Sequence, residues 1–163
     1  MGSMEHTAYL SLGSNVGDRA ANLRDAIARL QEFGTVSRVS SWYETEPVEL
    51  TEQPWFLNCA VEMHTALAPL DLMKAMLNIE RAMGRERNQP KGPRNIDLDL
   101  LLYDNDTVTT PELTVPHPAM HERRFVLTPL AEIAPHAMHP VLRKNAFQLL
   151  ATLPPDFEVR RVR

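Results

Sequence analysis

The sequence predicts an α+β fold in which helices pack on an antiparallel or mixed β-sheet. Segments rich in β-branched and aromatic residues alternate along the chain with segments whose apolar residues recur at helical spacing. These segments follow one another in the order β-α-β-β-α-β. With 163 residues, 44% of them hydrophobic, the chain is long enough to bury a core without disulfides or metal ions.

The first predicted strand and helix occupy the start of the chain. TAYLSLG, residues 7–13, is typical of a strand that ends at a glycine, and the following GSNVGD is typical of a turn. Apolar residues at helical spacing then predict a helix over residues 19–33. We expect Asp18 to be its N-cap and Gly34 to end it.

Two strands and a second helix are predicted next. Residues 37–45 and 55–65 are rich in β-branched and aromatic side chains, and a loop with a proline near each end separates them. Residues 68–84 have one apolar stripe at helical spacing, with Pro69 in the position that suits a first helical turn. We expect the methionines of this helix to fill the core.

The last core strand is predicted over residues 96–103, and two short helices, around 126–134 and 145–153, close the chain. The whole order is that of the ferredoxin-like, split βαβ arrangement, with additions at the C-terminus. It predicts helices packed on one face of the sheet. We expect one domain over residues 1–163, in which 1–4 (MGSM) are a scar of expression.

Composition excludes several classes of function. The formal net charge of −4 argues against a general nucleic-acid binder, which needs a basic surface. No apolar run reaches membrane-spanning length. The one cysteine, Cys59, lies in the apolar run FLNCAVEM and is expected to be a buried side chain. We therefore expect a cytoplasmic protein with no nucleic-acid or membrane partner. We also expect a monomer, although composition does not bear on the oligomeric state.

Two carboxylates interrupt the most aliphatic strand. Asp97 and Asp99 are two residues apart, so they point to the same face, with Cα atoms roughly 6.6 Å apart. At an effective dielectric near 20, their charges repel by about 2.5 kcal/mol. Either salt bridges to nearby arginines or a hard divalent cation such as Mg²⁺ has to offset this repulsion.

A basic loop precedes the aspartates directly. RERNQPKGPR carries Arg85, Arg87, Lys91 and Arg94 in a chain that is acidic overall. A charge run of this kind is commonly a solvated surface. Arginine forks also match phosphate oxygens, and a cationic loop beside a carboxylate–magnesium site suits a polyphosphate such as ATP. The sequence has no P-loop, since GSNVGD lacks the spacing and the lysine.

Five segments together resemble one enzyme family. KGPRNIDLDLLL and LTVPHPAMHERRFVLTPLAEIAP carry the strongest likeness, and AYLSLGSNVGDR, SSWYETEPV and QPWFLNCAV follow the same family in the same order. The likeness is to 6-hydroxymethyl-7,8-dihydropterin pyrophosphokinase of folate biosynthesis, and it covers nearly the whole chain. It implies transfer of the β,γ-diphosphate of ATP to the hydroxymethyl group of the pterin, with release of AMP. It further implies in-line attack at the β-phosphorus and two Mg²⁺ ions held by Asp97 and Asp99.

The same resemblance implies roles for other residues. The residues expected to act on the phosphates in catalysis, beside the two aspartates, are Arg85 and Arg94. Those expected to bind ATP are Glu80, Arg87, Lys91, Thr114, His117 and Arg123. Those expected to bind the pterin are Thr45, Val48, Phe56, Asn58 and Phe125, with the two phenylalanines on either side of the ring and the Asn58 amide at its edge. Without the resemblance, the phenylalanines would be assigned to the core and Glu80 equally to an exposed helix surface.

Two rival functions remain open on the residues alone. The first is a magnesium-dependent nucleotidyltransferase or nuclease, which the acidic balance disfavours. The second is a ferredoxin-like binding domain without catalysis, in which the aspartates pair only with arginines. Zinc binding by His117 and His121 is disfavoured because Pro118 lies between them and the HExxH glutamate is missing.

Overall fold

The computed structural model describes residues 5–45, 55–84, 95–154 and 159–162. The main sheet contains β1 (His6–Ser14), β2 (Thr35–Val39), β3 (Trp42–Thr45), β4 (Phe56–Thr65), β5 (Asp97–Tyr103) and β10 (Val159–Val162). The helices are α1 (Arg19–Leu30), α2 (Pro69–Ala82), the 3-10 helix η1 (Met120–Glu122), α3 (Arg124–Ile133) and α4 (Ala146–Ala151). Two small hairpins pair β6 (Val108–Thr109) with β7 (Thr114–Val115) and β8 (Met138–His139) with β9 (Lys144–Asn145).

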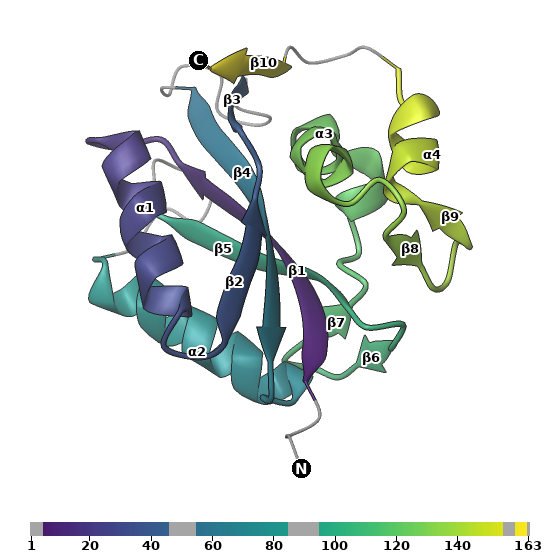
Figure 1. Cartoon of the computed structure of the whole chain (residues 1–163), viewed down its shortest axis with the longest axis horizontal. Coiled ribbons are helices and arrows are strands. Elements are labelled where there is room, and N and C mark those ends of the chain that lie inside the picture. The colour runs from purple at the N-terminus through teal and green to yellow at the C-terminus, as the bar shows by residue number, and fades with distance from the viewer. Residues whose placement is uncertain (1–4, 46–54, 85–94, 155–158, 163) are drawn as a thin grey trace.

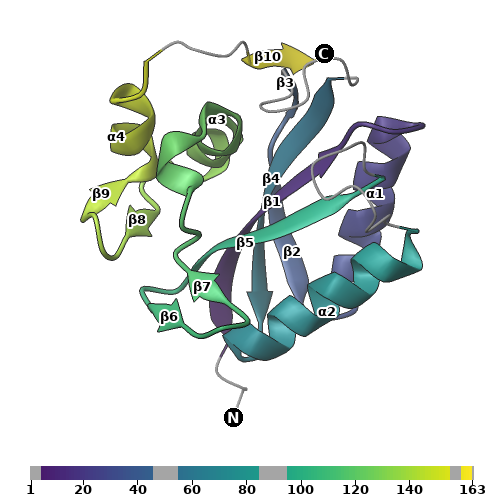
Figure 2. The ribbon, with the colours of Figure 1, turned by 180° about the vertical axis from the view of Figure 1, so that it is seen from behind.

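The main sheet has the order β10-β3-β4-β1-β5, and β2 also pairs with β4 (Figures 1 and 2). Each of these pairings is antiparallel, so of the two predicted sheet types the antiparallel one is correct. The predicted βαββαβ order is confirmed. It puts the strand that carries the aspartates at one end of the sheet, next to β1.

Helices cover both faces of the sheet, so the expectation of helices on one face only is wrong. Helices α1 and α2 pack on the face that carries Leu10, Cys59 and Leu98. Helix α3 packs on the opposite face, over Ala60 and Leu101, and α4 packs against α3 (Figure 1). The second face has an apolar patch of its own, and burial of that patch requires a second helical layer.

The predicted strand over residues 37–45 is broken into β2 and β3, and the break anchors α3. At the break, the Ser40 hydroxyl accepts a hydrogen bond from the Ala60 backbone N–H at 2.9 Å. The next backbone N–H, of Ser41, turns away from β4 and donates to the Glu132 carboxylate of α3 at 3.1 Å. The Tyr43 hydroxyl donates to the same carboxylate at 2.7 Å. The last turn of α3 is therefore tied to β3.

Several local predictions are confirmed and two boundaries differ. The Asp18 side chain accepts a hydrogen bond from the Ala21 backbone N–H and caps α1, and Pro69 begins α2. Helix α1 ends at Leu30, three residues earlier than expected. Gly13 does not end the first strand but lies inside β1.

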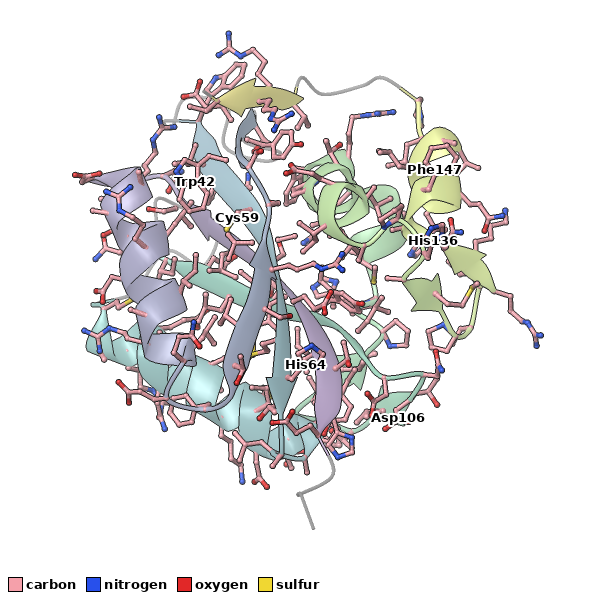
Figure 3. The ribbon with its side chains drawn as sticks, in the orientation of Figure 1. Trp42, Cys59, His64, Asp106, His136 and Phe147 are labelled. Carbon is pink, nitrogen blue, oxygen red and sulfur yellow. The ribbon has the colours of Figure 1, made fainter. Side chains whose placement is uncertain are left out.

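Cys59 is fully buried among core residues under α1 (Figure 3). Burial raises the pKa of its thiol to about 12, so the thiolate is scarce at neutral pH and this cysteine is not a nucleophile. Across the described residues, no helix combines the length and apolar character needed to cross a membrane.

Candidate active site

The candidate site lies on the face of the sheet that α3 covers. Asn58 of β4, Gly13 of β1 and Asp97 of β5 are direct cross-strand neighbours, in that order. Side chains that lie directly opposite each other in an antiparallel pair point to the same face. The Asn58 amide and the Asp97 carboxylate therefore share one face, with only the bare backbone of Gly13 between them.

The two aspartates share this face, as their spacing predicts. Asp97 and Asp99 lie opposite Gly13 and Ser11 of β1 and are half-buried, whereas Leu98 between them is buried on the other face. The Asp99 side chain is 36% exposed. Solvent access at this level lets a ligand reach the carboxylate.

The pterin candidates on β3 and β4 are already bonded to each other. The Asn58 side-chain amide donates to the Thr45 hydroxyl oxygen at 2.6 Å, and both residues are buried. This bond fixes the amide, so its oxygen and its second N–H have a set direction. Phe56 is two residues before Asn58 on β4, so it points to the same face. Phe125 lies in the first turn of α3, and both rings are partly exposed.

His117 lies beside the aspartates. Its Nε2 is 3.9 Å from Asp99 Oδ1, and its Nδ1 accepts a hydrogen bond from the Ala119 backbone N–H at 3.1 Å. Burial, together with the smaller effect of the Arg123 charge, lowers the pKa of His117 to about 4, although the charge of Asp97 opposes the shift. The ring is therefore neutral at pH 7, and because Nδ1 is an acceptor, the proton sits on Nε2. That N–H points to the side of the aspartates and can donate to a ligand.

Arg123 lies near both Phe125 and His117. Its guanidinium carbon lies 5.6 Å from the centre of the Phe125 ring, in cation–π range. The same charge acts on His117, as its effect on the pKa of that ring shows. Arg123 thus stands between a residue expected to bind the nucleotide and one expected to bind the pterin.

Glu80 is a buried residue and not an exposed helix glutamate. It is 3% exposed in the last turn of α2, and its Oε2 accepts a hydrogen bond from the Leu98 backbone N–H at 2.8 Å. Leu98 is the residue between the two aspartates. Glu80 therefore fixes the backbone of β5 between the two aspartates.

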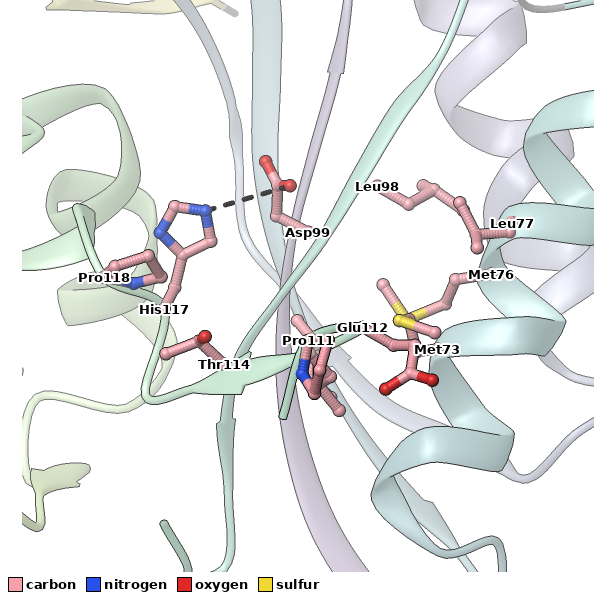
Figure 4. Close-up of a pocket in the computed structure, with 12 residues that line it drawn as sticks. Met73, Met76, Leu77, Leu98, Asp99, Pro111, Glu112, Thr114, His117 and Pro118 are labelled. Carbon is pink, nitrogen blue, oxygen red and sulfur yellow. Dashed lines mark ion pairs between the residues drawn. The ribbon is translucent and has the colours of Figure 1, made fainter. Parts of the chain in front are cut away.

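A pocket of about 320 Å³ opens beside β5, between α2 and the segment that leads to η1 (Figure 4). Its polar lining consists of Asp99, Glu112, Thr114 and His117, and all of these but Glu112 are expected to bind ATP or metal. Its apolar lining comes from Met73, Met76, Leu77, Leu98, Leu100, Pro111, Leu113 and Pro118. An apolar pocket with a few polar groups at its rim suits a flat ring that is attached to a charged chain.

Five expected site residues lie outside the described residues. These are Val48, Arg85, Arg87, Lys91 and Arg94. Their assignments remain expectations from the resemblance.

The carboxylate pair suits Mg²⁺ in one particular way. Within the described ranges, His, Cys, Asp and Glu side chains do not gather in groups of three or more that could hold a metal ion. Mg²⁺ is usually held by one or two carboxylates together with substrate phosphates. Asp97 and Asp99, on one face and accessible, fit that role.

Some residues of this site went unnoticed in the sequence. The sequence predicts that Gly13 ends a strand and begins a turn whose backbone could contact a ligand. It does not show that Gly13 lies inside the strand, where a glycine is a signal of close approach by another group. The methionines of α2 were assigned to the core, which holds for Met76, but Met73 and Met76 also line the pocket. Their helical spacing gave no sign of this second role.

Comparison with known proteins gives a consistent result. Residues 9–135 match the family model described as 7,8-dihydro-6-hydroxymethylpterin-pyrophosphokinase (HPPK). A 2-amino-4-hydroxy-6-hydroxymethyldihydropteridine pyrophosphokinase of Bacillus subtilis is 50% identical over 132 residues, which cover 80% of this chain and 79% of the relative. The enzyme of the same name from Aquifex aeolicus is 41% identical over 138 residues, which cover 85% and 86%.

A solved structure supports the fold alone. The Plasmodium falciparum HPPK-DHPS with pteroate has a TM-score of 0.73 at 17% identity, and the match covers 93% of this chain and 43% of the solved one. The family match, by contrast, rests on sequence over most of the chain. This protein belongs to the 7,8-dihydro-6-hydroxymethylpterin-pyrophosphokinase family and is a pyrophosphokinase of folate synthesis.

Proposed function

We propose that this protein transfers the β,γ-diphosphate of ATP to the hydroxymethyl group of 6-hydroxymethyl-7,8-dihydropterin in a Mg²⁺-dependent reaction that releases AMP. The observation that carries the proposal is the cross-strand row of Asn58, Gly13 and Asp97. It aligns an amide suited to a pterin edge with a carboxylate suited to a metal-bound phosphate. The two substrates would meet above one sheet face.

The pterin is held at the β3–β4 end. The Asn58 amide, fixed by Thr45, supplies an acceptor and a donor to the ring edge. Phe56 and Phe125 supply aromatic faces from the sheet and from α3. Val48 adds a contact near the same ring. This end of the site selects the acceptor substrate.

The nucleotide is held at the β5 end. Its base enters the pocket beside α2, and Thr114 and the His117 Nε2–H lie at the rim, toward the phosphates. Glu80 supports the site by fixing Leu98 between the aspartates. Arg123 adds positive charge near the phosphates, and so do Arg85, Arg87, Lys91 and Arg94.

Asp97 and Asp99 would hold two Mg²⁺ ions against the triphosphate. When bound, the ions neutralise charge on the phosphates and orient them for displacement. The protein aligns the pterin hydroxyl with the β-phosphorus, so that a new O–P bond forms while the bond to the α-phosphate oxygen breaks and AMP leaves. The hydroxyl proton is released to solvent water in this step. The contribution of the side chains is mostly alignment and charge stabilisation.

The protein would work as one pyrophosphokinase domain over residues 1–163, as a monomer in the cytoplasm. The single cysteine, which is free and buried, suits a reducing compartment. The oligomeric state is measured by size-exclusion chromatography with light scattering.

The deciding experiment is an assay of AMP formation from ATP. AMP is expected only when both 6-hydroxymethyl-7,8-dihydropterin and Mg²⁺ are present, in equal amount to the diphosphorylated pterin. AMP release without the pterin, or only with nucleic acid, would favour a nucleotidyltransferase or nuclease. Absence of Mg²⁺-dependent ATP binding in calorimetry would favour a binding domain without catalysis.

A further inference from the structure

Gly13 occupies a place where a side chain would be expected. It lies inside β1, with β4 on one side and β5 on the other, and its backbone does not adopt the positive φ that would call for glycine. Glycine in a strand interior lowers stability relative to residues with a side chain. The reason for glycine here is therefore the space above it and not the shape of the backbone.

That space is bounded by two residues expected to bind the pterin. A Cβ atom built on Gly13 would lie 2.6 Å from the Asn58 Oδ1 atom and 3.4 Å from Cδ1 of Phe56. The first distance is far below van der Waals contact, so one of the two groups would have to move. Gly13 is fixed by the strand, which leaves the Asn58 amide as the group that moves.

The Asn58 amide has little freedom to move. Its N–H is bonded to the Thr45 hydroxyl at 2.6 Å, and the side chain is buried, with the residue 3% exposed. Rotation away from a Cβ atom at position 13 would break this bond and leave buried polar groups without partners. Such groups are expensive to leave unpaired.

The other neighbour of Gly13 is Asp97. Adjacent strands lie about 4.8 Å apart, so Asn58 and Asp97, two strands apart, are separated by roughly 10 Å across Gly13. A two-ring ligand that is held at its edge by Asn58, and whose hydroxymethyl arm reacts near Asp97, has to cross this strand. Its path passes over the bare backbone of residue 13.

We propose that Gly13 is a positioning residue of this site, which acts through Asn58. Because Gly13 has no side chain, the Asn58 amide keeps the orientation that binds the pterin edge. No side chain of residue 13 then stands between Asn58 and Asp97, so the substrate can extend over the backbone from one to the other. This inference rests on the proposed function, because it takes Asn58 and Asp97 as the two ends of the reaction site. The inference adds Gly13 to the site, although Gly13 has no side chain that could contact Asn58 or Asp97.

The test is the Gly13→Ala variant, with affinity for 6-hydroxymethyl-7,8-dihydropterin and for Mg-ATP measured separately by calorimetry. We expect the pterin Kd to rise at least about 10-fold, equal to about 1.4 kcal/mol. The Mg-ATP Kd, measured without pterin, is expected to stay within about two-fold because the pocket that binds the nucleotide does not contact residue 13. An unchanged pterin Kd in Gly13→Ala would overturn the inference.

Gly17→Ala is the matched control for lost stability. Gly17 has a φ of +70°, so alanine strains the backbone there, but no atom lies within 4 Å of the added Cβ. We expect this variant to unfold at a lower temperature and to bind the pterin as the parent does. An equal rise of the pterin Kd in both glycine variants would show a general effect and would count against the inference.

The double variant Gly13→Ala with Asn58→Ala tests the route of the effect. If residue 13 acts by displacing the Asn58 amide, the double variant loses less pterin affinity than the two single losses together. Full additivity would contradict that route. A normal pterin Kd in Asn58→Ala alone would instead overturn the proposed pterin site itself, so the two failures are distinguishable.

Discussion

The two ends of the site differ in the burial and the hydrogen bonding of their polar side chains. At the β3–β4 end, Thr45 and Asn58 are 2% and 3% exposed and already hydrogen-bonded to each other. At the β5 end, Asp99 is 36% exposed and Thr114 is exposed at the rim of an open pocket. The β3–β4 end is therefore preformed. The β5 end is open, and its polar groups remain accessible to a ligand.

Under the proposed function, the chemistry of the two substrates accounts for this difference. A neutral ring is recognised by shape and by a few directed hydrogen bonds, which work best when the partners are buried and fixed. A polyphosphate with its cations brings its own charges and oxygen ligands, so the protein needs to supply accessible carboxylates and cations. The β3–β4 end is therefore rigid, and the β5 end is accessible to solvent and ligand.

The largest effect is expected at the open end. Asp99→Asn keeps the size of the side chain but removes a negative charge from the cation site, so kcat should fall by about 1,000-fold or more. Because the side chain is accessible, thermal stability should change little. Steady-state AMP formation over a range of Mg²⁺ concentrations measures the first effect, and thermal denaturation measures the second. Full turnover in this variant would remove the metal role from Asp99.

A smaller effect is expected at the preformed β3–β4 end. Thr45→Val keeps the volume but deletes the oxygen that holds the Asn58 amide, so a buried N–H loses its partner at a cost of about 1–3 kcal/mol. We expect lower stability in urea and a pterin KM about 10-fold higher, with the KM for ATP nearly unchanged. Thr45→Ser, which keeps the hydroxyl, is the control and should restore most of both. Equal changes in the two KM values would contradict the separation of the ends.

The smallest effect concerns His117, which lines the pocket at the β5 end. In the unfolded chain a histidine takes up a proton below about pH 6.5, but in the folded protein the pKa of His117 is lowered to about 4. The contribution of the neutral ring to stability is thus present above pH 6.5 and is lost as the pH falls toward 4. Between pH 7 and pH 5, the parent should lose about 1–2 kcal/mol more of its free energy of unfolding than His117→Asn, with allowance for partial exposure. Urea unfolding at both pH values measures this, and equal losses would count against the shift.

Local patterns were enough to predict the elements that form the site. The alternation around Asp97 and Asp99 correctly put both carboxylates on one face, and the βαββαβ order put their strand next to β1. These features depend on neighbours along the chain and on simple rules of strand geometry. Asp18 at the start of α1 was predicted for the same reason.

Contacts between distant segments were not predictable from such patterns. Glu132 reads as one more polar helix residue, yet it binds Ser41 and Tyr43, which lie about 90 residues earlier in the chain. Glu80 likewise carries no local sign of its bond to the Leu98 backbone. The helical layer of α3 was missed because its position depends on those pairings rather than on its own periodicity.

Among the described strands, β5 is the last at its end of the sheet, and its outer edge is a potential template for a further strand. The Glu80 carboxylate accepts the Leu98 N–H on that edge, and the His117 backbone N–H donates to the Leu101 carbonyl at 3.0 Å. Exposed sheet edges invite pairing with other chains and aggregation, and occupied backbone groups prevent it. Glu80 and His117, both proposed for the nucleotide end, therefore also occupy backbone groups on this edge of the sheet.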